Sequence, residues 1–506
     1  MQKENVKVLL VYPEYPSTFW SYKYALRYFG KKATYPPLGL PTVAAMLPKE
    51  WHKKLVDMNT EALTDEDLRW ADYVFISAMI VQKKSAHEVI EKCKRCQVKI
   101  VAGGPLFTSE PETFAAVDHL VLNEAEVTLP LFLSDLNKGC AKHIYSSPEW
   151  PDLSQTPIPS WELIDFRKYA SLSIQYSRGC PFDCEFCDVV LLNGNRPRTK
   201  SRDQILAELD ALYNRGWRGN VLFVDDNFVG NKRKLKTEIL PAIIEWMRQK
   251  KFPFSFSTQA SINLADDEEL MRLMAGAGFN SVFVGIESPN EESLIEADKV
   301  PNLERDLLAS VKKIHNHGME VTGGFIVGFD SDPPTIFESQ IDFIQKSGIV
   351  AAMVGLLIAP YGTRLYQRLK KENRIVGDIS GDNTDCTTNL IPRMGYKTLL
   401  DGYKNMIHNI YSPKPYYERC KVLLTDYKSQ RTGAPRLQLI YFTALVKSIW
   451  FLGVKGEGRK YYWKLLAWAL LRRKSFWHAV YLQFTGDHFR QVAEGYAKMP
   501  TLELKP

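Results

Sequence analysis

Short apolar runs separated by helical segments dominate the first 135 residues of the chain. The runs are VKVLLVYP, KKLVDMN, ADYVFISAM, VKIVAGG and HLVLNEAE. Regular alternation of short strands and helices is typical of a parallel sheet that is wrapped by helices. We therefore predict that residues 1–147 form a doubly wound α/β domain.

The same alternation resumes after a proline-rich interruption. The segment SPEWPDLSQTPIPSWELIDF contains too many prolines for a helix or a strand, and it predicts a linker over residues 148–165. The second series of apolar runs consists of SLSIQYSRG, NVLFVDDNF, FSFSTQAS, SVFVGIES, VTGGFIVGF and AAMVGLLIAP. Helical segments with apolar residues at three- and four-residue steps separate these runs. Six strand-helix units predict a partial (β/α)6 barrel over residues 166–370.

From residue 371 to 506 the pattern changes to helices rich in aromatic and basic residues, which predicts a mostly helical C-terminal domain. Between Leu439 and Phe484 the chain interleaves Trp450, Phe451, Tyr461, Tyr462, Trp463, Trp468 and Trp477 with Lys447, Lys455, Arg459, Lys460, Lys464, Arg472, Arg473 and Lys474. A helix that lies on a membrane surface places its aromatic rings at the depth of the lipid headgroups and its basic side chains against anionic lipids, so this composition is typical of such a helix. Helices that pack on the barrel would carry the same residues on opposite faces. Both interpretations remain open.

Composition narrows the class of protein. At 506 residues the chain is long enough for two or three domains. Its net charge is +7, and its basic residues do not form the concentrated stripe that is typical of a nucleic-acid-binding protein. The amino terminus fits a first strand better than a secretory signal. Lys447 interrupts the longest apolar tract, so no membrane-spanning helix is predicted. We expect a cytoplasmic protein, with peripheral contact to the inner face of the membrane as an open question.

Three of the eight cysteines have the spacing of metal ligands. Cys180, Cys184 and Cys187 lie in CPFDCEFC directly after an apolar strand, where (β/α) enzymes place their chemistry. Thiolates favour iron-sulfur clusters or zinc, and a structural zinc normally needs a fourth protein ligand. The nearby sequence offers no such ligand. We therefore predict a [4Fe-4S] cluster with one iron left open.

The other cysteines are sparse, which argues against a disulfide scaffold. Cys93 and Cys96 form a CxxC within a predicted helix, where core and surface positions are the simpler interpretation and a metal or redox role is the alternative. Cys140, Cys386 and Cys420 stand alone and are predicted to be structural.

The spacing of the three cysteines resembles that of the radical S-adenosylmethionine (SAM) superfamily. The resemblance implies that the open iron binds the methionine part of SAM and that Phe186 approaches the adenine. Asp225 and Asp226 stand where many relatives carry Gly-Gly-Glu, so one of them is expected to bind the methionine amino group. The alternative is that this segment caps the helix beginning near Asn231.

Later strand ends continue the resemblance. Glu287 in GIES is similar in place to the residue that bonds the ribose hydroxyls, and a carboxylate accepts two such hydrogens. Gly324, Ile326 and Gly328 form a GxIxG that resembles the adenine-stacking strand, although an ordinary buried strand could carry the same glycines. The APYGT segment at 359–363 is expected to complete the adenine pocket.

The first domain resembles the cobalamin-binding module of a subclass of these enzymes. Its predicted strand ends carry Ser77, Gly103, Gly104, Pro105 and Glu124. In a doubly wound sheet, ligands bind at such carboxyl ends. The DxHxxG motif of many cobalamin proteins is absent, so cobalamin is expected to bind without a protein histidine on cobalt. The alternative is a vestigial flavodoxin-like module.

The whole chain resembles the cobalamin-binding radical SAM proteins with an extra C-terminal domain, most closely in LRWADYVFISAM, TQASINLA and VFVGIESPNEESL. That group includes hopanoid C2-methylases and tetraether-lipid ring synthases. The resemblance implies methylation of an unactivated carbon of an apolar or lipid-like substrate, with an electron donor such as flavodoxin or ferredoxin. Carbon-carbon bond formation or ring closure without methyl transfer is the first alternative. A cluster-carrying electron-transfer protein without turnover is the second.

Overall fold

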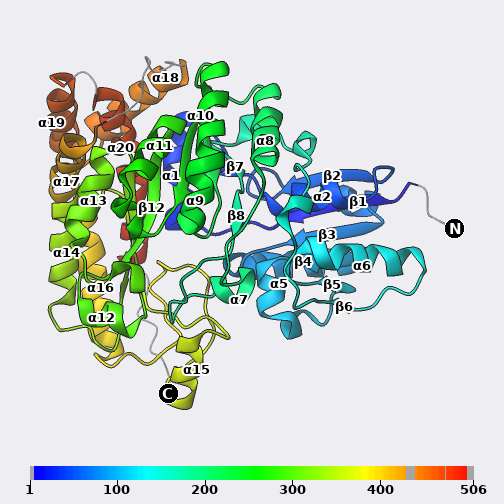
Figure 1. Ribbon diagram of the computed structural model, residues 1–506. Helices are drawn as coiled ribbons and strands as arrows, with labels where there is room; N and C mark the ends of the chain where they lie inside the picture. The colour runs from blue at the N-terminus through cyan, green and yellow to red at the C-terminus, as the bar shows by residue number, and fades with distance from the viewer. Residues whose placement is uncertain (1–4, 429–438, 473–474, 498–506) are drawn as a thin grey trace.

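A computed structural model describes residues 5–428, 439–472 and 475–497 of the chain. Figure 1 shows three parts side by side: a sheet domain in blue and cyan, a second sheet with its helices mainly in green, and orange to red helices packed against the second sheet. The arrangement confirms the predicted fold class of two α/β sheet domains followed by a helical region.

The first sheet has six parallel strands in the order β2-β1-β3-β4-β5-β6. The strands are β1 (Lys7–Tyr12), β2 (His52–Asp57), β3 (Tyr73–Ser77), β4 (Lys99–Gly103), β5 (His119–Val121) and β6 (Ile144–Tyr145). The connecting helices are α2 (Gly39–Met46), α3 (Asp65–Trp70), α4 (Lys83–Arg95), α5 (Pro105–Ser109) and α6 (Ala125–Asn137). Separate hydrophobic cores lie on the two faces of the sheet, which explains the continuous apolar runs of the inner strands β1, β3 and β4.

The second sheet also has six parallel strands, in the order β14-β13-β12-β11-β10-β7. They are β7 (Leu172–Ile174), β10 (Asn220–Phe223), β11 (Ser255–Gln259), β12 (Phe279–Glu287), β13 (Glu320–Val327) and β14 (Ala352–Leu356). The main outer helices are α8 (Arg202–Asn214), α10 (Leu240–Gln249), α11 (Glu268–Ala277), α13 (Leu307–Asn316), α14 (Ile336–Ser347) and α15 (Arg364–Lys371). Three short elements, α7 (Val189–Asn193), α9 (Lys232–Lys234) and α12 (Glu291–Glu296), follow strand ends. The predicted six strand-helix units are therefore present.

The C-terminal region consists of α16 (Tyr396–Tyr411), α17 (Pro413–Asp426), α18 (Leu439–Ser448), α19 (Arg459–Leu470) and α20 (Phe476–Ala497). Helices α16 and α17 pack against α14 of the barrel. Helix α1 (Lys23–Phe29) belongs to the amino-terminal part of the chain, yet it packs against α18 and α20. Arg27 and the Tyr28 hydroxyl both bond the Asp487 carboxylate, at 2.6 and 2.8 Å. The sequence did not predict this excursion of the chain.

The segment expected to be a linker is packed rather than extended. It contains the 3-10 turns Leu153–Gln155 and Trp161–Leu163, and the Trp161 side chain is fully buried. The Ser160 amide donates to the Pro41 carbonyl oxygen at 2.9 Å, which ties the segment back to the first domain. The two sheets are therefore joined by a folded connection.

Candidate active site

One cavity of about 3040 Å³ reaches from the first sheet through the barrel to the C-terminal helices. At the first sheet it is lined by the carboxyl-end residues Ser77, Gly103, Gly104, Pro105 and Glu124, and at the middle by Asp226. In the barrel and beyond it is lined by Ser257, Phe283, Glu320, Tyr481 and Phe484. The cavity thus connects the strand ends of both sheets.

The three predicted cluster ligands lie in a loop between β8 (Ser177–Arg178) and α7. Gly179 begins the loop with φ 92°, and a Cβ there would approach three carbonyl oxygens at 2.9 Å, so only glycine fits. The Cys180 amide donates to the Gly194 carbonyl at 3.2 Å, and the Glu185 amide donates to Ala297 O at 2.9 Å. The loop is therefore held by backbone contacts on two sides.

The Asp-Asp-Asn segment after β10 supports this loop. Asp225 is fully buried and accepts hydrogen bonds from the backbone and hydroxyl of Ser177, the hydroxyl at 2.6 Å. Burial raises the pKa of the Asp225 carboxyl to about 7. Asp226 accepts from the Gly179 amide at 2.8 Å, and Asn227 Nδ2 lies 3.8 Å from the Cys180 sulfur. Both aspartates, predicted as candidates for the methionine amino group, thus bond the loop in this structure.

Capping of the following helix falls to a different residue. The Asn231 side chain accepts from the Lys234 amide at 3.1 Å and caps α9. The side chains of Asp225 and Asp226 bond the cluster loop instead of this helix. Of the two, Asp226 also lines the large cavity, so its carboxylate is the one that faces space for a ligand.

A partly buried lysine lies beside the cluster loop. Lys299 Nζ is 2.6 Å from Glu287 Oε1 and lies 6.0 Å from the centre of the Phe186 ring. Burial raises the pKa of the Cys184 and Cys187 thiols, that of Cys187 to about 12, while the Lys299 charge acts in the opposite direction. A fixed cation next to thiols favours their charged, ligating form.

Glu287, the residue predicted for the ribose hydroxyls, ends β12 in the left-handed region, with φ 61°. A Cβ on the neighbouring Gly285 would come within 2.3 Å of the Glu287 carboxylate and 2.8 Å of Lys299 Nζ, so these two side chains would have to move. The Glu287–Lys299 pair therefore occupies a tightly packed corner at the carboxyl end of the barrel.

The remaining SAM candidates gather near this corner. Phe186, Ile326 and Ala359 belong to one hydrophobic cluster, although they come from three different segments. A Cβ on Gly324 would approach the Phe283 ring at 2.7 Å, and Gly328 has φ 110°. The structure therefore brings the predicted adenine strand next to the aromatic residue of the cluster loop.

No three His, Cys, Asp or Glu side chains among the described residues surround a common position for one metal ion. Three thiols that each bind a different iron of a cluster do not have to converge on one point, whereas the ligands of a structural zinc do. The donor set, three thiols on one loop with a lysine beside it, thus fits a cluster better than zinc.

The glycine turn after β4 is shaped for close approach. A Cβ on Gly103 would lie 2.5 Å from the Val121 carbonyl oxygen, and a Cβ on Gly104 would lie 2.6 Å from Ser77 Oγ. Gly104 also has φ 93°, and Pro105 begins α5. Both glycines line the cavity, and the absence of a Cβ lets the turn pack closely against Val121 and Ser77.

Glu124, predicted as a cofactor contact, bonds arginines of the barrel instead. Its carboxylate pairs with Arg178 and Arg198, and Glu126 pairs with Arg178 at 2.8 Å. Asn123 before it takes φ 60°, a conformation that asparagine tolerates. The strand end of the first sheet is thereby tied to the strand that precedes Cys180.

Comparison with known proteins gives this arrangement its family. Residues 32–133 match the B12 binding domain, 174–344 the radical SAM superfamily and 363–500 a domain of unknown function. The chain is 40% identical over 97% of its length to an uncharacterized methyltransferase of Synechocystis sp., covering 92% of that protein. It is 32% identical over 92% of its length to the hopanoid C-2 methylase of Rhodopseudomonas palustris, covering 90% of that protein.

The chain belongs to the cobalamin-binding radical SAM methyltransferases. Among solved structures, the cobalamin-dependent SAM radical enzyme OxsB superposes with a TM-score of 0.63 at 15% identity, over 97% of this chain and 80% of that one. The radical SAM methyltransferase TsrM of Kitasatospora setae superposes with a TM-score of 0.55 at 16% identity, over 72% of this chain and 76% of that one. Both likenesses concern the fold.

This family membership confirms three predictions: a radical SAM methyltransferase, a [4Fe-4S] cluster with SAM, and cobalamin. Three charged residues of the methyltransferase were not predicted from sequence, namely Lys299, Arg178 and Arg198. Arg178 lies only two residues before Cys180, so its position in the loop was visible, but its partner was not. Lys299 follows Glu287 by twelve residues with no local motif.

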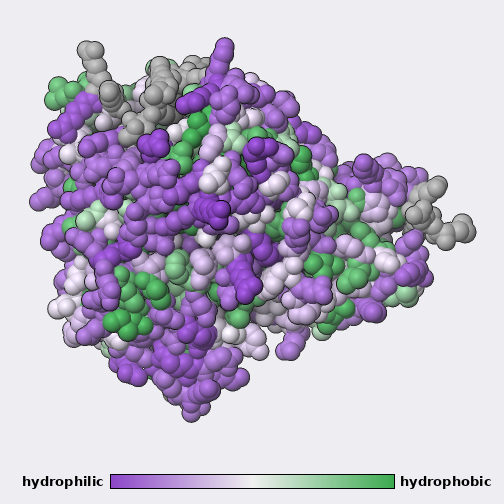
Figure 2. All heavy atoms as spheres, viewed as in Figure 1, coloured by the Kyte–Doolittle hydropathy of each residue, from purple (hydrophilic) through white to green (hydrophobic). Residues whose placement is uncertain are grey.

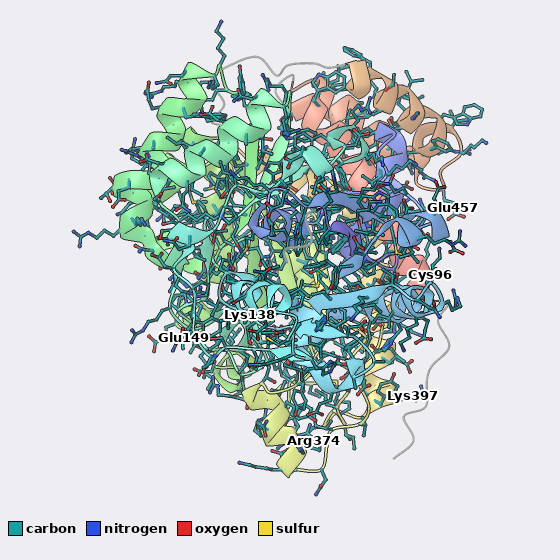
Figure 3. All side chains as sticks on the ribbon, turned by 90° about the vertical axis from the view of Figure 1, so that its right-hand side faces the viewer. Cys96, Lys138, Glu149, Arg374, Lys397 and Glu457 are labelled. Atoms are coloured by element: carbon teal, nitrogen blue, oxygen red, sulfur yellow. The ribbon has the colours of Figure 1, made fainter. Side chains whose placement is uncertain are left out.

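The other cysteines of the methyltransferase lie apart from the cluster loop. Cys93 is buried in a core of the first domain, where burial raises the pKa of its thiol to about 12, and Cys96 is half-buried. Figure 3 shows Cys96 at the periphery of the first domain. Cys140 is exposed, and Cys386 and Cys420 are buried.

The aromatic and basic C-terminal segment divides into two faces. Tyr462 is buried, Trp468 packs against the core and Trp477 lines the cavity. Trp450 and Trp463 are exposed, at 52% and 46%. Arg473 and Lys474 lie outside the described residues. None of the described helices is both long and apolar enough to span a bilayer.

Proposed function

We propose that this methyltransferase methylates an unactivated carbon of an elongated, lipid-like substrate that lies in the large cavity between the two sheets. The observation that carries the proposal is the continuity of that cavity. One space is lined by the Gly103-Gly104 turn, by Asp226 beside the cluster loop, and by the barrel interior. A molecule inside it would lie between the Gly103-Gly104 turn and Asp226, which bonds the cluster loop.

The chain's own residues would divide the work. Cys180, Cys184 and Cys187 would hold the cluster, and Asp226 would orient the methionine amino group. Gly103 and Gly104 would let a corrin approach the backbone. When bound, the cofactors supply a carbon-centred radical and a methyl group, so the protein itself contributes binding, orientation and exclusion of water.

The lipid-like class of substrate is supported by the walls of the cavity and by one relative. The lining includes the aromatic side chains Trp20, Phe283 and Phe484. The volume of about 3040 Å³ exceeds the several hundred to roughly one thousand Å³ of ordinary small-molecule sites. The Rhodopseudomonas palustris relative is named as a hopanoid methylase, and its likeness spans most of both chains.

The test is anaerobic reconstitution with SAM labelled in its methyl group, a reductant and a hopanoid hydrocarbon. We expect 5′-deoxyadenosine and a labelled methylated product. An Asp226→Asn variant should give less of both, because a neutral amide attracts an ammonium less strongly. Formation of 5′-deoxyadenosine with an altered but unmethylated product would show bond or ring formation instead. A reconstituted cluster with no SAM cleavage would show an electron carrier.

We further propose that an electron donor docks beside α12. Ile295 and Val300 are exposed at 61% and 56%, and Figure 2 shows an apolar patch over α12. The helix lies next to the cluster loop, since the Glu185 amide bonds the carbonyl oxygen of Ala297 at its end. An apolar patch close to the cluster suits a short electron path and transient docking.

An Ile295→Asp variant should slow SAM cleavage supported by flavodoxin and leave cleavage supported by dithionite unchanged, because the small reductant needs no docking surface. Ile144→Asp, at an exposed position on β6, is the matched control. Equal rates with flavodoxin in wild type and Ile295→Asp would exclude this surface.

Contact with a membrane surface is a third proposal. Phe442, Val446, Trp450 and Val454 are exposed at four-residue intervals along α18 and the turn that follows it. Lys455 lies 4.9 Å from the Trp450 ring centre. An apolar stripe with cations beside it is what an interfacial helix presents to anionic lipid.

Flotation with anionic and neutral liposomes tests this contact. A Val446→Ser/Trp450→Ser variant should bind anionic liposomes less than wild type, and Ile295→Ser should bind as wild type does. Wild-type protein that stays unbound at low salt would refute surface docking and would favour delivery of the substrate in solution.

A further inference from the structure

Tyrosine hydroxyls without partners among the described residues line the cavity where the segment around α1, β13 and α20 meet. Tyr22, Tyr35 and Tyr481 all line it, and their hydroxyls form no hydrogen bond with the described residues. Tyr481 lies among packed elements, yet 46% of its surface is accessible because it faces this space. A hydroxyl that has no partner in the protein and faces a cavity can donate to and accept from a ligand there.

A partly buried carboxylate–imidazole pair lies next to these hydroxyls. Glu320 Oε2 is 2.8 Å from His478 Nε2, and both side chains line the cavity. Burial first and the Glu320 charge second raise the pKa of the Tyr481 hydroxyl, which places the carboxylate close to it. Glu320 is likewise close to Tyr22.

The five side chains come from three parts of the molecule. Tyr22 and Tyr35 lie in the amino-terminal segment around α1. Glu320 begins β13, and His478 and Tyr481 lie on α20. Tyr22 holds the left-handed conformation, with φ 48°, which is uncommon for a bulky residue and is often found at binding sites. The segment around α1 and the C-terminal helices therefore complete a pocket that the barrel alone does not have.

The polar character extends along the amino ends of the barrel strands. Asn220, Ser255, Ser257 and Ser281 all line the cavity there. Trp20 and Phe283, with ring centres 5.2 Å apart, form an aromatic wall above them. A ligand in this part of the cavity would therefore meet apolar walls first and polar groups at its far end.

The distance along β13 sets the length of that ligand. Glu320 precedes Gly324 by four residues and Gly328 by eight, and a strand rises about 3.3 Å per residue. The polar groups thus lie roughly 13 to 26 Å from the half of the strand expected to hold adenine. This span suits a rigid polycyclic or long-chain molecule and exceeds the length of a small metabolite.

We propose that Tyr22, Tyr35, Glu320, His478 and Tyr481 form a second binding site, the tyrosine pocket, for the hydroxylated end of an elongated apolar substrate. The proposal rests on the proposed methylation of a lipid-like molecule and adds the group that fixes its orientation. Hydroxyls both donate and accept hydrogen bonds, so they can satisfy the tyrosines and the Glu320 carboxylate together. With that end anchored, the opposite end of the molecule reaches the cofactors.

The test compares two probes on the full-length protein: a hopanoid hydrocarbon and the same skeleton with a polyhydroxylated side chain. Dissociation constants are measured in matched detergent for wild type, Tyr481→Phe, Glu320→Gln and the control Tyr461→Phe. Tyr461 lies on α19 against Tyr417, away from the cavity lining. Thermal unfolding of each variant shows whether it remains folded.

Wild type should bind the hydroxylated probe more tightly than the hydrocarbon. Tyr481→Phe should reduce that preference about three- to tenfold, the effect of one lost hydrogen bond. Tyr461→Phe should keep the wild-type preference. Equal affinities in wild type, no binding of either probe, or an unchanged preference in both pocket variants would overturn the proposal.

Methylation of the same probes separates this proposal from the function on which it rests. If both probes are methylated without a binding preference, the proposed function holds and the tyrosine pocket is wrong. If the binding preference exists and Tyr481→Phe weakens it, but neither probe is methylated, the pocket holds and the proposed substrate is wrong.

Discussion

The two parallel sheets of this protein have the same number of strands but distribute their side chains differently. In β1 of the first sheet, Leu9 and Val11 pack into one core, while Val8 and Leu10 pack into another on the opposite face. In the second sheet only one face is a core. Val282 of β12 packs outward against the helices, and its inward neighbours line the cavity.

This difference determines how each sheet can bind a ligand. A sheet covered on both faces leaves only its carboxyl edge accessible, so we expect the first sheet to meet its cofactor at the turn of Gly103 and Gly104. A curved sheet with an open interior can use side chains along the whole length of a strand. Glu320 and Thr322 of β13 line the cavity, while Ile326 near the end of the same strand packs in the cluster that contains Phe186.

The largest effect is expected at the carboxyl edge of the second sheet. Replacing Cys180, Cys184 and Cys187 by alanine should abolish the cluster's absorbance and all SAM cleavage, because the substitution removes all three thiolates of the predicted ligand set. Iron content and 5′-deoxyadenosine are the measurements. The Cys93→Ala/Cys96→Ala variant should keep both, and unchanged iron in the triple variant would contradict the assignment.

A second change tests whether the first sheet binds through its backbone. In Gly104→Ala the new Cβ would lie 2.6 Å from Ser77 Oγ, so the turn must move. A displacement that costs about 1.4 kcal/mol of binding lowers cobalamin affinity about tenfold. Cobalamin retained after anaerobic purification is the measurement.

Gly139→Ala is the matched control for that turn. Gly139 also has a positive φ, of 72°, but a Cβ there meets nothing within 4 Å. Its substitution should cost roughly 1 kcal/mol of stability through backbone strain and leave cobalamin binding intact. Equal cobalamin loss in both variants would show that backbone strain at the substituted glycine, and not the contact between the new Cβ and Ser77, weakens cobalamin binding.

A third change separates the two sheets. Glu124→Gln would leave Arg178 and Arg198 without their shared carboxylate. Removing one partner of such an ion pair lowers the free energy of unfolding by on the order of 3 kcal/mol. We expect the ratio of methylated product to 5′-deoxyadenosine to fall, because the Gly103-Gly104 turn is no longer held in a fixed position relative to the cluster loop. Glu162→Gln, which breaks an exposed pair with Arg215, should keep the wild-type ratio.

The last change concerns the helical layer behind the second sheet. His315 on α13 is fully buried, and burial lowers the pKa of its imidazole to about 3. Below about pH 6.5 the unfolded chain takes up a proton that the folded protein does not, so stability falls as pH decreases towards 3. At pH 5 the loss is about 2 kcal/mol.

His315→Leu should therefore flatten the decrease in unfolding free energy between pH 6.5 and 3, measured by urea unfolding. An unchanged pH dependence would show that the imidazole is protonated in the folded protein.

The sequence alone determined the features that are encoded by neighbouring residues. Continuous apolar runs predicted the strands of the first sheet, because both faces of that sheet are buried. The eight-residue CPFDCEFC loop predicted the cluster ligands, since all three thiols lie within one local turn. The Gly103-Gly104-Pro105 turn was recognisable for the same reason.

Only the tertiary structure decided which distant residues meet. Glu287 pairs with Lys299, Glu124 pairs with Arg198, and Tyr22 faces the same space as Tyr481. No periodicity or motif encodes such contacts, because they depend on how packed helices and strands orient their side chains across the fold. The packing of α1 against α20 is the clearest case. The apolar residues of α1 indicate that the helix is buried, but only the structure shows which helices cover it.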